Sequence, residues 1–516
     1  MRFKRIIKES KDAVQQKTDK RQQNQEVEAF FRIVKEQITY KPVREEACRE
    51  LEAHIEDKTE EYIHSGMSEE KAAVQAVKEM GDAASVGVLL NESYCLQMDY
   101  RLIGFILLGV LSGIAANLAY GYTIFDSGYC FLGLAVLYAV TVYGYRFCVL
   151  HTKKLSVVAI LIALFLGVYG LASASMGGYF YQSVWEVCKY VEMVIHRFIL
   201  PHTFFYNGML LLVPLCAILH YKEKNKKWSG VMEAAIIIVV AVAGVTTHPW
   251  KQYMLTANVI VLTSYFVLSI ITIGKKKELI VPILAVGLCT GLLFGATGEG
   301  SVSENLKQCF KPEVQAASRW EDAYNSVLIK ELLDRAEFAG EIELTQEELV
   351  EYGVGTWYFH DEKGNKLITD HNYEYYYGDE SYYEKMEDIL PSAYQNNYRI
   401  AYTILKYGWG MGIVFLAVLA GLIGLLFYTT FRIKNKLGFY MAFGSSMVLS
   451  LQILLYTAGN FGYQFGMFTT LPFVSEGKLS SIVNMTLAGL VLSAYRYDRV
   501  TNEEEIGQRG RRFKEA

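Results

Sequence analysis

The stretch Leu471-Pro-Phe-Val-Ser-Glu-Gly-Lys-Leu-Ser-Ser481 joins two apolar segments near the end of the chain. It contains a proline, a glycine, three serines and two charged residues, so it does not read as part of a membrane-spanning helix. Irregular polar backbone is tolerated at membrane depth only where protein covers it or where it lines a water-filled cavity. We therefore expect this stretch, called the re-entrant segment below, to line a cavity or an outer mouth with the other helices packed around it.

The rest of the chain is apolar enough for a polytopic membrane protein. Of its 516 residues, 52% are hydrophobic, and several runs reach the roughly 20 apolar residues that a spanning helix needs. Basic clusters follow every even-numbered run, and this pattern predicts that both termini are cytoplasmic. We predict an all-α polytopic membrane protein with ten transmembrane helices, at residues 102–120, 129–149, 155–174, 203–220, 230–247, 254–273, 279–296, 408–428, 437–458 and 478–494.

These spans divide the chain into regions of different character. The predicted regions are a basic N-terminal arm (1–25), an N-terminal cytoplasmic helical domain (26–98), spans one to seven (102–296), a large extracytoplasmic loop (297–400), spans eight to ten (408–496) and a cytoplasmic tail (497–516).

The region 26–98 shows helical spacing of its apolar residues, with Gly66 and Gly81 expected to end two helices and Ser68 to cap the second. The region contains Arg44-Glu-Glu, Leu51-Glu-Ala-His-Ile, Gly66-Met-Ser-Glu-Glu-Lys-Ala and Met80-Gly-Asp82. In this pattern it resembles the permease prefix domain found in front of several bacterial membrane proteins. The resemblance implies a regulatory or docking module.

The outer loop carries several local signals. A capping box at Thr345–Glu348 predicts a helix start, and residues 356–369 read as two short strands around a turn. The stretch 373–383 is rich in tyrosine and acids, and it either stacks on sugars or a partner or packs its own rings. Residues 179–199 are too polar to span and predict an amphipathic helix on the outer surface.

Sequence motifs exclude several classes of protein. There is no P-loop, GxSxG or HExxH motif, and the eight cysteines form no CxxC pair, so neither a disulfide framework nor a metal site is predicted. Ionisable residues are scarce inside the spans, which argues against an ion-coupled transporter. We expect no cofactor, with a divalent metal left open, and no nucleic-acid partner.

The C-terminal region carries a spaced set of polar, glycine, proline and apolar residues: Gln452, Gly462, Leu471, Pro472, Phe473, Ser475, Gly477, Ser480, Asn484 and Gly489. This set is similar to the signature of the SEDS family (FtsW, RodA and SpoVE, which act in cell shape, elongation, division and sporulation). The match covers less than a tenth of the chain closely. Ten spans, cytoplasmic termini and a long loop after span seven also agree with the family.

The resemblance implies an enzyme that polymerises lipid-linked disaccharide into glycan strands, commonly beside a penicillin-binding transpeptidase. The family's presumed catalytic acid falls on Asn396, counting from Pro391, or on Asn397, counting back from Gly408. An amide cannot act as the base, although Asp388 could substitute. The candidate substrate-groove residues are Gln452, Pro472, Ser475, Gly477, Lys478, Ser480 and Asn484.

Three hypotheses for function remain open. The first is a SEDS-like protein of the bacterial cytoplasmic membrane that has lost or weakened its polymerase chemistry and binds lipid-linked cell-wall precursor or a partner. That partner would be a penicillin-binding transpeptidase or a division or sporulation protein. The second is an active peptidoglycan glycosyltransferase, and the weaker third is a transporter of lipid-linked sugar. A carboxylate facing Ser475 and Gly477 would favour the second hypothesis.

Overall fold

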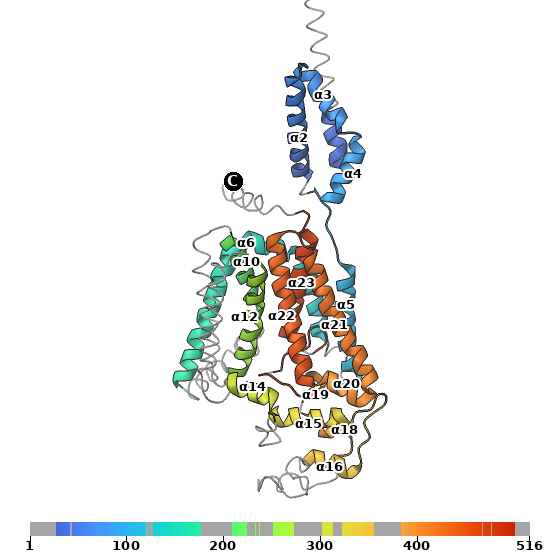
Figure 1. Cartoon of the computed structure of the whole chain (residues 1–516), viewed down its shortest axis with the longest axis vertical. Helices are drawn as coiled ribbons and strands as arrows, with labels where there is room; N and C mark the ends of the chain where they lie inside the picture. The colour runs from blue at the N-terminus through green and yellow to red at the C-terminus, as the bar shows by residue number, and fades with distance from the viewer. Residues whose placement is uncertain are drawn as a thin grey trace, which may run out of the picture. The chain divides into compact units, whose positions relative to one another are not determined.

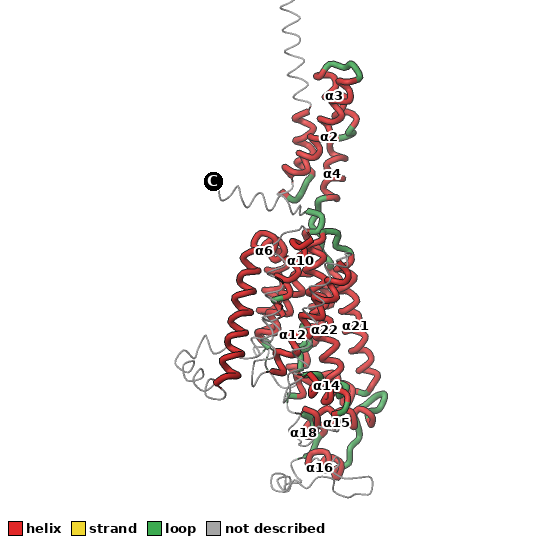
Figure 2. Tube along the Cα trace, turned by 60° about the vertical axis from the view of Figure 1, so that its left-hand side comes forward, coloured by secondary structure: helices red, strands yellow, loops and turns green. Residues whose placement is uncertain are grey.

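The computed structural model describes most of the chain, and every regular element in that part is a helix (Figures 1 and 2). The all-α prediction is therefore confirmed for the described residues. These are residues 27–41, 44–119, 127–176, 209–223, 251–272, 302–312, 322–354, 383–391, 393–466, 468–475 and 477–500, with the single residues 123, 233 and 237.

The chain divides into two compact units. The first holds residues 1–98 and 496–509, and the second holds residues 99–495 and 510–516. The sequence therefore returns to the first unit after the last long helix. The backbone amide of Gln97 donates to the carbonyl of Arg496 (3.1 Å), and the Arg499 guanidinium donates to the Glu92 carbonyl (3.1 Å).

The first unit is a small helical bundle. A helix over residues 27–37 packs with α2 (Arg44–His64), α3 (Glu69–Glu79) and α4 (Ala83–Ser93). Its core comprises Phe30, Val34, Ile38, Ala47, Cys48, Leu51, Ile55 and Ala76.

The glycine stops of this bundle are confirmed, but one predicted cap is wrong. Gly66 and Gly81 follow α2 and α3 with φ of 96° and 90°, a conformation that favours glycine. Ser68 lies at the N-cap of α3, but its side chain makes no capping hydrogen bond. Asp82 does cap its helix, because its carboxylate accepts from the Ser85 amide (2.9 Å) at the start of α4.

The second unit contains the long apolar helices. They are α5 (Tyr100–Ala119), α6 (Gly128–Met176), α10 (Leu212–Glu223), α12 (Lys251–Thr272), α21 (Trp409–Phe431), α22 (Lys436–Asn460) and α23 (Lys478–Tyr497). A kink at His151 divides α6 between the residues predicted for spans two and three.

Four helical stretches are long and apolar enough to cross a membrane, among the residues that the structure describes. They are Tyr100–Leu118, Gly128–His151, Trp409–Phe431 and Lys436–Asn460. Their presence supports membrane insertion. The full number of ten spans and the side on which each terminus lies stay predictions.

The helix α22 is the central element of the second unit. Buried residues make up 78% of its most apolar stretch, against 22–28% in the other three. It packs against α10, α12 and α21, and it lies between α12 and α21 in both views (Figures 1 and 2). A helix that is covered on all sides can carry polar side chains into the interior, and α22 carries several.

Shorter helices form the region before α21. They are α14 (Val302–Phe310), α15 (Asp322–Arg335), α16 (Gln346–Val354), α18 (Met386–Ile389), α19 (Tyr394–Asn397) and α20 (Arg399–Tyr407). Several predictions lie outside the described residues: the arm 1–25, the outer amphipathic helix 179–199, spans five (except Glu233 and Ile237) and seven, the strands at 356–369, the stretch 373–382 and residues 501–516.

Candidate functional site

The re-entrant segment is buried in protein. Its residues Leu471–Ser475 are all buried, and the turn is closed because the Leu471 amide donates to the Ser475 hydroxyl (3.0 Å). Val474 packs on α5 at Gly113, where an added Cβ would lie 2.5 Å from the Val474 carbonyl oxygen. Only glycine permits this approach. The sequence allowed either protein or a water-filled cavity around this segment, and in the structure residues 471–475 are surrounded by protein.

Asn396 lies directly against this segment. Its backbone carbonyl accepts from the hydroxyl of Tyr456 on α22 (2.7 Å) and from that of Ser475 (3.4 Å). The carbonyl of Asn397 instead accepts from the amide of Asn460 (2.9 Å). Of the two candidates for the acid position, Asn396 is therefore the one that contacts the re-entrant segment.

Arg399 is a charged residue of this site that the sequence did not point to. It is 3% exposed, at the start of α20. Its Nη2 donates to the side-chain oxygens of Asn117 (3.0 Å) and Asn396 (3.3 Å). Its Nε and Nη1 atoms are buried and make no hydrogen bond within the described part of the chain. The hydrogen bonds of this guanidinium in that part of the chain thus go to neutral amides.

Asn117 is fixed by residues at the start of α6. Its amide nitrogen donates to the hydroxyls of Tyr129 (2.9 Å) and Ser127 (3.3 Å). Since both donor positions are directed toward α6, the amide oxygen is left facing Arg399. The orientation of Asn117 therefore favours a positive charge at that point.

The start of α20 is held by α22. The side-chain oxygen of Asn460 accepts from the amides of Ile400 (3.0 Å) and Ala401 (3.1 Å), and the Tyr456 hydroxyl accepts from the amide of Arg399 (3.1 Å). These bonds satisfy N–H groups that a helix leaves unpaired at its N-terminus. The cap comes from another helix, and it fixes the position of Arg399.

The predicted groove residues divide into separate contacts. Gln452 donates to the side-chain oxygen of Asn484 (3.1 Å), and both are buried. Ser480 donates to the carbonyl of Gly477 (3.0 Å). Pro472 is buried in the re-entrant segment, and the side chain of Lys478 lies outside the described residues. Among the seven candidates, Ser475 donates from its hydroxyl to the Asn396 carbonyl (3.4 Å).

The carboxylate of Asp388 is engaged in local structure. Its Oδ2 accepts from the backbone amides of Glu384 (3.0 Å) and Lys385 (2.9 Å) at the start of α18. Acids at this position stabilise a helix start. The contacts of Asp388 that the structure records are therefore those of a cap.

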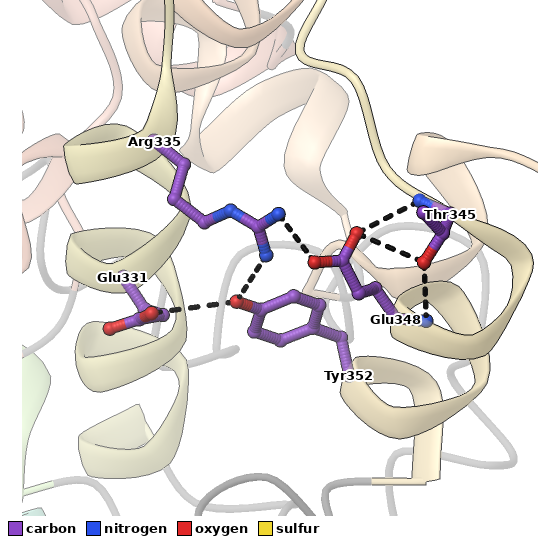
Figure 3. Close-up of polar contacts among 5 residues, drawn as sticks. All are labelled: Glu331, Arg335, Thr345, Glu348 and Tyr352. Atoms are coloured by element: carbon purple, nitrogen blue, oxygen red, sulfur yellow. Dashed lines mark hydrogen bonds and ion pairs between the residues drawn. The ribbon is translucent and has the colours of Figure 1, made fainter.

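A second charged cluster, the outer network, joins α15 to α16 (Figure 3). Arg335 pairs with the carboxylate of Glu348 (2.6 Å) and donates to the Tyr352 hydroxyl (2.9 Å). Glu348 also accepts from the Thr345 amide (2.9 Å), and the Glu348 amide donates back to the Thr345 hydroxyl (3.3 Å). The predicted capping box is confirmed. The Thr345 amide, followed by Arg335, lowers the pKa of Glu348.

A third charged contact links α20 to its surroundings. Lys406 near the end of α20 pairs with Glu341 (2.8 Å) and with Glu387 of α18 (3.3 Å), and Tyr402 donates to Glu387 (3.1 Å). The hydrogen bond to Glu341 is the main reason that the pKa of Lys406 is raised. The two ends of α20 therefore differ, because its exposed end carries paired charges and its buried end carries Arg399.

Among the described residues, no group of three or more His, Cys, Asp or Glu side chains is placed to hold a metal ion. The chemical character of the site is that of a buried cation surrounded by amides and hydroxyls. Such a site can bind an anion or orient a polar group. The side chain of Asn396 is an amide, so it cannot act as a general base.

Comparison with known proteins leaves the family open. No family model matches the sequence, and no curated protein matches it. Several solved chains are similar to this one, and one of them matches at a TM-score of 0.49 and 14% identity, over 79% of this chain and 100% of that chain. Its structure is described as "Structural coordination of polymerization and crosslinking by a peptidoglycan synthase complex". A likeness this distant assigns neither a family nor an activity.

Proposed function

We propose that this protein is a SEDS-like component of peptidoglycan assembly that binds lipid-linked precursor and has lost its polymerase chemistry. The observation that supports this is the amide of Asn396. Counted from Pro391, it falls on the position of the family's acid, as Asn397 does when counted back from Gly408. Asn396 lies against Ser475 of the re-entrant segment, and its side-chain oxygen accepts from Arg399.

The chemical argument concerns proton transfer. A general base must lie within hydrogen-bond reach of the proton that it abstracts. The amide of Asn396 is not a base, and the guanidinium of Arg399 offers hydrogen-bond donors and no acceptor. Asp388, the substitute considered from the sequence, caps α18. Binding without polymerisation is therefore the function that these groups favour.

The proposed setting is the bacterial cytoplasmic membrane, with both termini on the cytoplasmic side. Residues 496–500 follow the last long helix and belong to the same compact unit as residues 1–98. Val500 packs against the core of that unit. These contacts support one common side for the two ends. The first unit would then be a docking module on the cytoplasmic side. The proposed partner of the whole protein is a penicillin-binding transpeptidase or a division or sporulation protein.

The test is glycan polymerisation by the purified protein, supplied with lipid-linked disaccharide and divalent metal beside an active relative. Binding of the same disaccharide is measured in parallel. We expect saturable binding and no polymer. Polymer formation would establish the alternative, an active glycosyltransferase, and the outer acids would then be replaced one at a time. Absence of both binding and polymer would overturn the proposal.

A further inference from the structure

The side chain of Arg399 carries a positive charge although it is buried. Moving a charged group out of water costs several kcal/mol unless it is paired and hydrogen-bonded. Arg399 is 3% exposed, yet its described contacts are two neutral amide oxygens on one of its three nitrogens. Elsewhere in the same unit, Arg335 and Lys406 are more exposed and are paired with carboxylates.

The unused donors lie on two sides of the guanidinium. Nε carries one N–H and Nη1 carries two, and none of these makes a hydrogen bond in the described part of the chain. Nη2, between them, is already directed at Asn117 and Asn396. Because both N–H groups of Nη2 are engaged, an oxygen atom of an anion would accept from Nη1 or from Nε separately. Phosphate groups present several such oxygen atoms, and arginine is well suited to bind them.

The position of the residue points to an amphiphilic ligand. Arg399 contacts Asn117, which lies close to the C-terminal end of α5, and Tyr456, which lies close to the C-terminal end of α22. Both helices are long and apolar enough to cross a membrane. A group at the end of such helices lies at the depth of lipid headgroups, where phosphate is abundant.

We propose that Arg399 binds a phosphate or pyrophosphate group of an amphiphile, with Asn117 and Asn396 holding the guanidinium in place. The identification of that amphiphile with lipid-linked precursor rests on the proposed function. The anion site itself depends only on the guanidinium and its two amide contacts. Because Nε and Nη1 are buried, the packing over them must open before the anion reaches them.

The experiment uses the full-length protein in a neutral, phosphate-free detergent. Three probes are titrated separately: inorganic pyrophosphate, phosphatidylglycerol and lipid-linked disaccharide. The readouts are the midpoint of thermal unfolding and the dissociation constant. The variants are Arg399→Gln, which removes the charge, and Arg399→Lys, which keeps it. Lys311→Gln is the matched control, because Lys311 is an exposed basic residue outside the site.

We expect at least one phosphate-bearing probe to raise the midpoint of the wild type and of Lys311→Gln in a saturable manner. Arg399→Gln should bind that probe about tenfold more weakly or worse, and Arg399→Lys should fall between the two. A response to the lipids would support both the anion site and its assignment to an amphiphile. A response to pyrophosphate alone would support the anion site and overturn the assignment to an amphiphile.

Other outcomes separate this inference from the proposed function. If no probe affects the wild type, or if Arg399→Gln responds as strongly as the wild type, the anion site is overturned. If the wild type and Arg399→Gln bind lipid-linked disaccharide equally, the proposed function is supported and the anion site at Arg399 is overturned. If phosphatidylglycerol binds through Arg399 and the disaccharide does not bind, the anion site is supported and the proposed function is overturned. If Arg399→Gln fails to fold, the wild-type titration and the Arg399→Lys variant still test the anion site.

Discussion

Arg335 and Arg399 belong to the same unit of this protein and have opposite surroundings. The side chain of Arg335 is 32% exposed and bonds both a carboxylate and a tyrosine hydroxyl. Arg399 is 3% exposed and bonds two amides. Stability alone would place the counter-ion at the buried arginine, because water already screens the exposed one. Among the described residues, Arg335 therefore makes the ion pair of a structural contact, whereas the hydrogen bonds of Arg399 go to amides alone, which is the basis of the proposed anion site.

The largest effect is expected from giving Arg399 a carboxylate. In Asn396→Asp, an acidic oxygen replaces the one that now lies 3.3 Å from Nη2. Pairing a buried cation in this way should raise the free energy of unfolding by about 3 kcal/mol. The guanidinium should also lower the pKa of the new acid, so polymerisation should not appear. Thermal unfolding and the polymerisation assay measure the two effects.

The control for that substitution is Asn397→Asp. The contact recorded at Asn397 is made by its backbone carbonyl with Asn460, so this variant should gain much less stability. Equal stabilisation by both variants would contradict the special pairing at position 396. Polymer made by Asn396→Asp would show that the site is otherwise intact and needs only its acid.

A smaller effect is expected from the outer network. Glu348→Ala removes the cap on Thr345 and the partner of Arg335, and it should destabilise α16 by about 1–2 kcal/mol. Glu348→Gln keeps a capping side chain and removes the charge, so it should cost less than about 1 kcal/mol. Amide hydrogen exchange across α16 measures both. Glu347→Ala, at the exposed neighbouring position, should change little.

The same residue predicts a dependence on pH. The pKa of Glu348 is lowered in the folded state from an ordinary value of 4.5, first by the Thr345 amide and then by Arg335. Its stabilising contribution is therefore complete above the unfolded pKa and is lost as the pH falls through the folded pKa. The protection of α16, measured as exchange relative to the intrinsic rate at each pH, should fall in that acidic window, and Glu348→Gln should reduce this loss of protection. Unchanged acid sensitivity in Glu348→Gln would assign it to other groups.

The smallest effect on the second unit is expected from deleting residues 1–97. This segment belongs to the separate compact unit, so the apolar helices of the second unit should still insert into the membrane. The site around Asn396 and Arg399 should keep its ligand binding. Regulation or partner choice should change. Protease protection in membranes and the binding assays measure this. Failure of the shortened chain to insert would show that the first unit is required for the fold of the second.

The sequence by itself determined the helical class, several long apolar helices and many local ends. Periodicity, glycine stops and the capping box at Thr345 depend on residues close together in the chain, so they can be read from it directly. The cap on α3 was wrong, because an N-cap residue need not turn its side chain to the backbone. The resemblance brought Asn396 and Ser475 to attention, but it did not say which of the two asparagines lies beside the re-entrant segment.

Only the tertiary structure decided what surrounds Arg399. Its partner Asn117 is separated from it by 282 residues, and Tyr456 by 57. In the sequence, Arg399 is an ordinary basic residue before a predicted span, and nothing local indicates that it is buried. Burial arises when α5, α20 and α22 meet at one point, and burial is what converts a common solvated charge into one that needs a partner.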